Sequence, residues 1–242
     1  MPNPIIILVR PQMGENIGAA ARVMANFGLS ELRLVAPRDG WPNFQAQAVA
    51  AHATHIIDAA KIYATTEEAV ADLELVYATC CRMRDMEKPI LTPRELMPQL
   101  NPYVRTGILF GPERTGLENP DMTRAAAHIF IPVNPEYQSL NLAQAVAVVG
   151  YEWFTTPSPL IPLPEGEGQS EAKGEGLATQ EEVEGMLKHL ETIMDAANFY
   201  QVPHKKPKMD QNIRNIFTRA RLKSQEVNSL RGIFRAMGTK KD

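Results

Sequence analysis

Cysteine and long hydrophobic runs are both scarce in this chain of 242 residues. The only cysteines are the neighbours Cys80 and Cys81, and adjacent cysteines offer neither a disulfide framework nor the ligand spacing of a zinc site. No apolar run approaches the roughly 20 residues that a membrane-spanning helix needs. The first residues lack the basic start and long apolar core of a signal peptide. We therefore expect a cytoplasmic protein with no membrane contact and no metal site.

The first part of the chain has the pattern of a β-α-β unit. The continuous apolar run Ile5–Val9 is typical of a strand buried on both faces, and a second strand is expected at Leu32–Ala36. Between them we expect a helix that starts at Asn16, runs through Phe27 and is closed by Gly28. The dinucleotide fingerprint G-x-G-x-x-G and the phosphate-loop signature are both absent. A nucleotide-binding oxidoreductase is therefore disfavoured.

Apolar segments with strand character recur along the chain and alternate with helical ones. Beyond the first unit, strands are expected at Leu75–Thr79, Thr106–Phe110 and His128–Ile131. This alternation is typical of an α/β fold with a mostly parallel sheet. In such sheets ligands bind beyond the carboxyl ends of strands. The loops after the first strand and after the last two are therefore the candidate site.

Helix starts in the second half of the chain carry polar signals. Asn141, followed three residues later by Gln144, has the spacing of a capping box, and Thr179 with Glu182 repeats it. A further helix is expected to begin at Asn212, after a Pro- and Lys-rich segment. The first of these signals places polar groups at the mouth of a buried helix, directly after the last candidate loop.

Composition divides the chain into three parts. Residues 1–156 form the predicted α/β domain, and residues 157–178, rich in Pro, Gly, Glu and Ser, are expected to be a flexible linker. Residues 179–242 are expected to form a small all-α extension. From Gln201 onward, eleven Lys and Arg residues stand against three Asp and Glu residues, although the whole chain has a net charge of -3. This basic end favours a polyanionic partner, with a solvated helical surface as the alternative.

Three segments at the candidate loops resemble a known family. Asn16–Arg22, Phe110–Leu117 and Ile131–Ala143 resemble, in order and spacing, the three motifs of SpoU-type RNA ribose methyltransferases of the SPOUT class, over residues 4–156. The tail, residues 214–233, resembles the C-terminal extension of the TrmJ branch, which methylates the ribose 2′-hydroxyl of nucleotide 32 in the tRNA anticodon loop. The resemblance implies a deep C-terminal trefoil knot in the α/β domain, and a homodimer formed through the knot region. It also implies S-adenosyl-L-methionine as methyl donor, released as S-adenosyl-L-homocysteine, with no metal.

The resemblance also assigns catalytic residues. Arg22 matches the family's proposed catalytic arginine. Asn16 matches a residue that positions the ribose or this arginine, and Glu113 matches one that orders the catalytic loop. Ser139 and Asn141 match residues beside the reacting groups. A guanidinium stays protonated, with a pKa above about 12. We therefore expect Arg22 to grip an RNA phosphate and polarise the ribose hydroxyl rather than to act as a base. Each residue also has a plain alternative: Arg22 as a surface arginine, Glu113 as a turn carboxylate, the others as helix caps.

Two further sets of residues follow from the same match. The residues expected to hold the cofactor, mainly through backbone, are Thr79, Cys80, Cys81, Gly111, Ile131, Gln138, Ser139, Leu140 and Leu142. The candidate RNA contacts are Arg10, Arg82, Arg84, Arg114, Arg214, Arg219 and Arg221.

Several alternatives stay open at the level of sequence. Ribosomal RNA is the alternative substrate, because only the tail favours tRNA. A knotted RNA-binding factor without catalysis is the alternative from another class. The sequence does not decide whether Arg22 serves the cofactor site of its own protomer or that of the partner.

Overall fold

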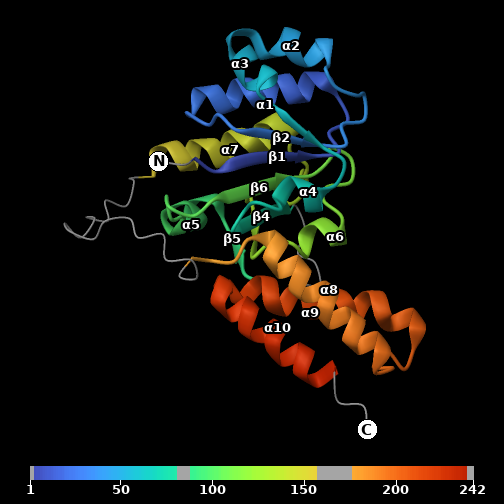
Figure 1. Ribbon diagram of the computed structural model, residues 1–242. Coiled ribbons are helices and arrows are strands. Elements are labelled where there is room, and N and C mark those ends of the chain that lie inside the picture. The colour runs from blue at the N-terminus through green and yellow to red at the C-terminus, as the bar shows by residue number, and fades with distance from the viewer. Residues whose placement is uncertain (1–2, 81–87, 157–175, 239–242) are drawn as a thin grey trace, which may run out of the picture.

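A single parallel sheet is the centre of the fold. The computed structural model describes residues 3–80, 88–156 and 176–238. Within them, seven strands pair in the order β3-β2-β1-β6-β4-β7-β5, and every pairing is parallel. The strands are β1 (Ile5–Val9), β2 (Leu32–Val35), β3 (Lys61–Tyr63), β4 (Leu75–Cys80), β5 (Ile90–Leu91), β6 (Thr106–Phe110) and β7 (Ala127–Phe130). The predicted α/β class with a parallel sheet is confirmed (Figure 1).

Helices cover both faces of the sheet. In β1, Ile6 and Leu8 belong to one core cluster, whereas Ile5, Ile7 and Val9 belong to another, as the alternation of side chains along a strand requires. The first face carries α1 (Gly14–Asn26), α2 (Phe44–Ala50), α3 (Thr54–Asp58), α5 (Pro93–Leu96) and α7 (Leu142–Thr155). The opposite face carries α4 (Thr66–Val70) and α6 (Asn119–Met122).

Helix α1 begins two residues earlier than the sequence pattern predicts. Its first residue is Gly14, and the residue before it, Met13, makes no side-chain cap. A Cβ atom at Gly14 would lie 2.0 Å from Oδ1 of Asn43, which caps α2. Only glycine allows the two helix starts to approach this closely. The prediction that Asn16 starts the helix is therefore wrong: Asn16 lies in the first turn, and its side chain is available to partners outside the helix.

The other two capping signals are confirmed. The Asn141 side chain accepts from the N–H of Ala143, and Gln144 closes a capping box at the start of α7. Thr179 and Glu182 form the predicted box at the start of α8 (Gln180–Ala196). These boxes fix where both helices begin.

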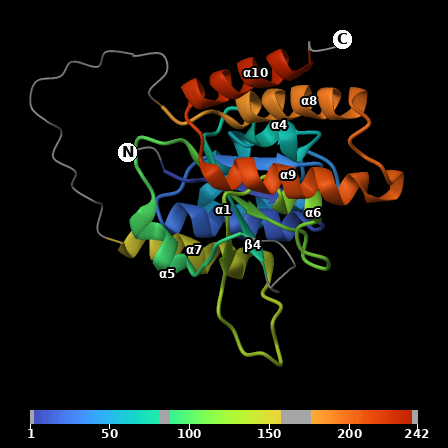
Figure 2. The ribbon, with the colours of Figure 1, turned by 90° about the horizontal axis from the view of Figure 1, so that it is seen from below.

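The C-terminal helices pack on the α4 and α6 side of the sheet (Figure 1). Helices α8, α9 (Lys206–Ala220) and α10 (Ser224–Gly238) share a small core of their own, and Figure 2 shows them side by side across one face of the molecule. Helix α9 begins six residues before the predicted Asn212. Pro207 is compatible with this start, because N–H groups in the first turn have no acceptor within the helix, so the N–H that proline lacks is not missed there.

The end of the predicted linker is packed. Leu177 forms an antiparallel bridge with Lys223, and the N–H of Ala178 donates to the carbonyl of Leu222 at 2.8 Å. Residues 176–178 thus pack against the start of α10, and residues 157–175 of the predicted linker lie outside the described part of the chain. The domain boundaries and the trefoil knot stay predictions. None of the helices in the described ranges is long and apolar enough to cross a membrane.

Candidate active site

A cavity of about 320 Å³ opens at the carboxyl ends of β4, β6 and β7. Its walls are the strand ends, the loop of residues 111–117, the loop between β7 and α7, and the first turns of α7. The residues from the predicted cofactor set that line it are Thr79, Cys80, Gly111, Ile131, Gln138, Ser139, Leu140 and Leu142. Cys81 lies outside the described residues. The structure thus brings together every described member of this predicted set.

The loop after β6 folds tightly back on itself. The N–H of Gly116 donates to the carbonyl of Pro112 at 2.9 Å, and Gly116 has a φ of +66°. A Cβ atom at Gly111 would lie 2.3 Å from the backbone nitrogen of Leu117. Glycine at both positions therefore permits the turn, which places Glu113 and Arg114 on the cavity wall.

Sequence reasoning missed part of the apolar wall. Phe110, Leu117 and Met122 line the cavity and are buried. Phe110 and Leu117 are the first and last residues of the motif Phe110–Leu117, each next to a glycine, so their place on the cavity wall could have been predicted. Met122 ends α6, and no sequence pattern connects it to the site.

A chain of hydrogen bonds joins three predicted catalytic residues at this edge of the sheet. Nδ2 of Asn16 donates to Oε1 of Glu113 at 2.6 Å, and Oδ1 of Asn16 accepts from Nδ2 of Asn141 at 2.9 Å. The other carboxylate oxygen of Glu113 accepts from the N–H of Gln12 at 3.1 Å. Oδ1 of Asn141 accepts from the N–H of Ala143 at 2.9 Å, as the helix cap requires. Each side chain is thereby oriented by its neighbours, which come from the first turn of α1, the loop after β6 and the start of α7.

Arg22 points away from this chain of hydrogen bonds. It lies on α1, six residues after Asn16, which is about 240° around the helix axis and about 9 Å along it. Its side chain is exposed, and no hydrogen bond or ion pair joins it to another residue in the described ranges. Within one protomer the structure therefore does not bring Arg22 together with Asn16, Glu113 and Asn141. Ser139 lies on the cavity wall and is exposed.

The predicted RNA contacts of the α/β domain have different environments. Arg114 is exposed and lines the cavity. Arg10, after β1, forms ion pairs with Asp121 and, at 3.6 Å, with Glu118, so it already has partners within the chain. Arg82 and Arg84 lie outside the described residues.

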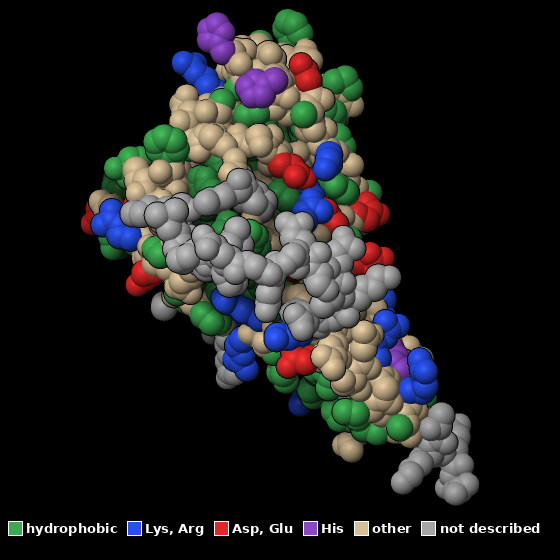
Figure 3. Space-filling model, turned by 60° about the vertical axis from the view of Figure 1, so that its left-hand side comes forward, with side chains coloured by type: hydrophobic (Ala, Val, Ile, Leu, Met, Phe, Trp, Pro, Cys, Tyr) green, Lys and Arg blue, Asp and Glu red, His purple; other side chains and the backbone are tan. Residues whose placement is uncertain are grey.

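The three predicted contacts in the tail also differ. Arg219 and Arg221 are exposed at the end of α9, and Nη2 of Arg221 donates to the phenol oxygen of Tyr77 at 3.4 Å. Burial raises the pKa of the Tyr77 phenol, and the Arg221 charge opposes that shift. Arg214 is largely buried and donates to both carboxylate oxygens of Glu184, so it binds within the fold. Figure 3 shows Lys and Arg side chains on the part of the surface formed by the C-terminal helices.

Comparison with known proteins gives matches over nearly the whole chain. The model of the SpoU rRNA Methylase family matches residues 3–151, and that of the tRNA methyltransferase TrmJ, C-terminal domain, matches residues 181–242. The chain is 37% identical over 240 residues to the tRNA (cytidine/uridine-2'-O-)-methyltransferase TrmJ of Cronobacter sakazakii, covering 96% of this chain and 95% of that protein. It is 36% identical over 236 residues to the tRNA (cytidine/uridine/adenosine-2'-O-)-methyltransferase TrmJ of Pseudomonas aeruginosa, covering 94% and 91%.

A solved structure agrees with these matches. The crystal structure of TrmJ from Z. mobilis ZM4 aligns with a TM-score of 0.86 and 43% sequence identity, over 97% of this chain and 99% of that one. The alignment includes the C-terminal helices as well as the sheet, since almost no residues are left out. As the three motifs and the tail predicted, the chain belongs to the SpoU methylase family, in its TrmJ branch.

Proposed function

We propose that the protein transfers a methyl group from S-adenosyl-L-methionine to a ribose 2′-hydroxyl of tRNA. The observation that carries this proposal is the cavity beyond β4, β6 and β7, lined by the residues that the motif match assigns to the cofactor and bordered by the Glu113–Asn16–Asn141 chain. The names of the relatives support the reaction and the substrate class. Nucleotide 32 of the anticodon loop remains the position expected from the tail resemblance.

The cavity fits such a cofactor. Its volume is in the range of small-molecule sites, about 300–1,000 Å³, and its wall is mostly apolar with a few convergent polar groups. Phe110, Leu117 and Leu142 offer apolar surface for an adenine ring, and Gln138 and Ser139 offer polar side chains. Bound there, S-adenosyl-L-methionine supplies an electrophilic methyl group. The backbone at Gly111 can approach the ligand closely because it carries no side chain.

The protein's own groups then have to bind and orient the acceptor. A ribose hydroxyl is a weak nucleophile, so its position and the stabilisation of its developing charge decide the rate. Asn16 and Asn141 are held rigidly by Glu113 and by the start of α7, so they can present fixed dipoles to the ribose. Arg22 remains a cation, binds a phosphate of the RNA and polarises the hydroxyl.

Arg22 serves the cavity of a second protomer in this proposal. Helix α1 directs it away from its own cavity, and an apolar patch lies at the C-terminal end of the same helix. Phe27, directly after α1, packs its ring against those of Tyr151 and Phe154 of α7, each with ring centroids 6.2 Å apart. Tyr151 and Phe154 are 52% and 64% exposed. An exposed aromatic patch of this kind favours a protein interface, and we assign it to the predicted homodimer.

The tail favours tRNA over ribosomal RNA. Its exposed basic groups at the end of α9, including Arg219 and Arg221, would add affinity that depends on phosphate rather than on sequence and that falls with salt. The match of the C-terminal helices to the TrmJ family model supports the same substrate. Ribosomal RNA and a factor without methyl transfer remain the outcomes to exclude by experiment.

The test is methyl transfer from labelled S-adenosyl-L-methionine to total tRNA from a strain that lacks this gene. Wild type is compared with Arg22→Ala and with Lys61→Ala, a control that removes an exposed charge at the far edge of the sheet. We expect a ribose methyl group at nucleotide 32 that is lost in Arg22→Ala and kept in the control. Label on ribosomal RNA alone would contradict the substrate, and failure to bind the cofactor would contradict the reaction.

A further inference from the structure

Lys88 is a buried lysine that the proposed reaction does not use. It is only 7% exposed. Its Nζ donates to the carbonyl oxygens of Met122, Thr123 and Ala125 at 3.2, 2.7 and 2.5 Å, and to Oγ1 of Thr218 at 3.2 Å. Nζ therefore meets only oxygen acceptors, four of them, which all accept from its N–H donors. Lys88 thus holds three carbonyls of one turn and one hydroxyl of α9.

The turn that Lys88 grips belongs to the wall of the cavity. Residues 122–125 connect α6 to β7, and Met122 lines the cavity. Upstream, α6 follows directly on the loop of residues 111–117, which carries Glu113. A shift of this turn would therefore move Met122 together with the C-terminal end of the loop of residues 111–117.

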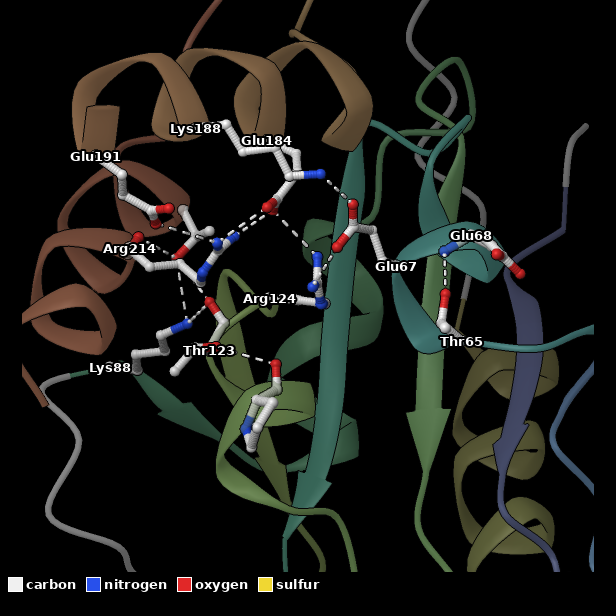
Figure 4. A network of polar contacts seen from close by, with 12 residues as sticks. Thr65, Glu67, Glu68, Lys88, Thr123, Arg124, Glu184, Lys188, Glu191 and Arg214 are labelled. Carbon is white, nitrogen blue, oxygen red and sulfur yellow. Dashed lines mark hydrogen bonds and ion pairs between the residues drawn. The ribbon is translucent and has the colours of Figure 1, made fainter. Parts of the chain in front are cut away.

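A second contact fixes the same turn to the C-terminal helices (Figure 4). Arg124 donates to Glu184 of α8 at 3.2 Å and to Glu67 of α4 at 3.0 Å. Glu184 also accepts from both terminal nitrogens of Arg214 on α9. The side chains of Arg124, Glu184 and Arg214 are between 11% and 16% exposed. Because these charges are shielded from water, each of them needs its ion-pair partner, and moving one side chain would leave another buried charge uncompensated.

Thr218 completes the connection. Its hydroxyl accepts from Lys88 and lies 3.2 Å from the carbonyl of Thr123 and 3.0 Å from that of Arg214 in its own helix. Helix α9 therefore contacts the turn through a short side chain at its buried face. The exposed end of α9 carries Arg219 and Arg221, so one helix links a basic surface to the cavity wall.

We propose that Lys88 is a positioning residue for the cofactor site: by joining α9 to turn 122–125, it makes the C-terminal helices set the affinity for cofactor as well as contribute to RNA binding. The inference rests on the proposed function, because it takes the cavity to be the cofactor site. The C-terminal helices then influence cofactor affinity, which a separate RNA-binding module would not do. By linkage, anything that displaces α9 weakens cofactor binding, and bound cofactor favours the docked position of α9.

The experiment measures the affinity of full-length protein for S-adenosyl-L-homocysteine by calorimetry, with melting temperature and tRNA binding measured alongside. Lys88→Met removes the donors and keeps the length of the side chain. Thr218→Val removes one acceptor on α9 and keeps its shape. Lys188→Met is the matched control, because Lys188 is an exposed lysine of the same network that reaches Glu67 but not the turn. Ile57→Val, at a buried residue of α3, controls for lost stability alone.

We expect Lys88→Met to weaken binding by about 3- to 30-fold, Thr218→Val by about twofold or more, and the two controls not at all. In the methylation assay, Lys88→Met should raise KM for the cofactor more than it lowers kcat. Unchanged affinity in folded Lys88→Met, or a loss confined to tRNA binding, would overturn the proposal. If Lys88→Met does not fold, unchanged affinity in Thr218→Val overturns it. If wild type itself binds no cofactor, the proposed function fails first.

Discussion

Two polar assemblies lie near the proposed cofactor cavity, and they differ in how much of their hydrogen-bonding capacity remains free. The Glu113–Asn16–Asn141 chain consists of one carboxylate and two amides at the mouth of the sheet, with Asn141 exposed. The network around Lys88 and Glu184 consists of charges buried between the α/β domain and the C-terminal helices. The first has hydrogen-bonding capacity left for a substrate, whereas the second is occupied within the chain. Exposure and hydrogen-bond partners thus distinguish polar groups that can contact a substrate from polar groups that stabilise the cavity wall.

Breaking the first assembly should affect catalysis most strongly. In Asn16→Asp a carboxylate replaces the amide that donates to Glu113, so two negative charges would face each other across 2.6 Å. We expect kcat to fall by about 10²–10³-fold, as for the loss of one oriented donor, with the protein still folded. Single-turnover methylation at saturating cofactor measures this. A loss below tenfold would show that Asn16 is not part of the reacting site.

Breaking the second assembly should affect stability instead. Glu184→Ala leaves Arg214 buried without its main carboxylate partner, and Arg124 keeps only Glu67. Removing one partner of a buried ion pair costs about 3–5 kcal/mol, and we expect about 3 kcal/mol because of the remaining pair. Urea unfolding gives the value. A cost below about 1 kcal/mol, typical of exposed pairs, would contradict the account of this network.

The pH dependence of stability sharpens the comparison further. Burial, with the charges of Arg214 and Arg219 nearby, lowers the pKa of Lys88 from 10.5 to about 7. Between those two values the unfolded chain holds a proton that the folded chain has released. Folding is therefore favoured as pH rises through this window, by at most about 1.4 kcal/mol per pH unit.

Unfolding of wild type and Lys88→Met in urea, at about pH 7.5 and about pH 9.5, tests this slope. The wild-type free energy of unfolding should rise more than that of Lys88→Met over the same interval. Equal slopes in the two proteins would show that Lys88 keeps its ordinary pKa in the folded state.

The smallest effect is expected at the exposed end of the network. Lys188 pairs with Glu67 at 2.8 Å but is 61% exposed. Lys188→Met should change the free energy of unfolding by no more than about 0.5 kcal/mol, because solvent screens such pairs. A thermal melt at two salt concentrations is sufficient. A loss comparable to that of Glu184→Ala would remove the distinction between the buried and exposed parts of the network.

The sequence predicted the cavity far better than it predicted the network. Strand ends of a parallel sheet converge on one edge, so the loops after Phe110 and Ile131 could be placed at one site from their order. The family resemblance then assigned Thr79, Gly111 and Leu142 to that site. The position of Asn16 in its helix was mispredicted because the start of α1 depends on Gly14 packing against Asn43. Lys88 and Thr218 are 130 residues apart. No local pattern reveals such a pair, since it exists only after α9 has docked.

The most direct measurement uses mixed dimers of Arg22→Ala and Asn16→Asp subunits, carrying different tags and purified as heterodimers. If Arg22 serves the partner's cavity, one site of each heterodimer contains both substitutions and the other contains neither. Methylation of tRNA should then recover to about half of the wild-type rate per dimer, whereas each homodimer stays inactive. Confirmed heterodimers with no recovery would contradict a site shared between protomers.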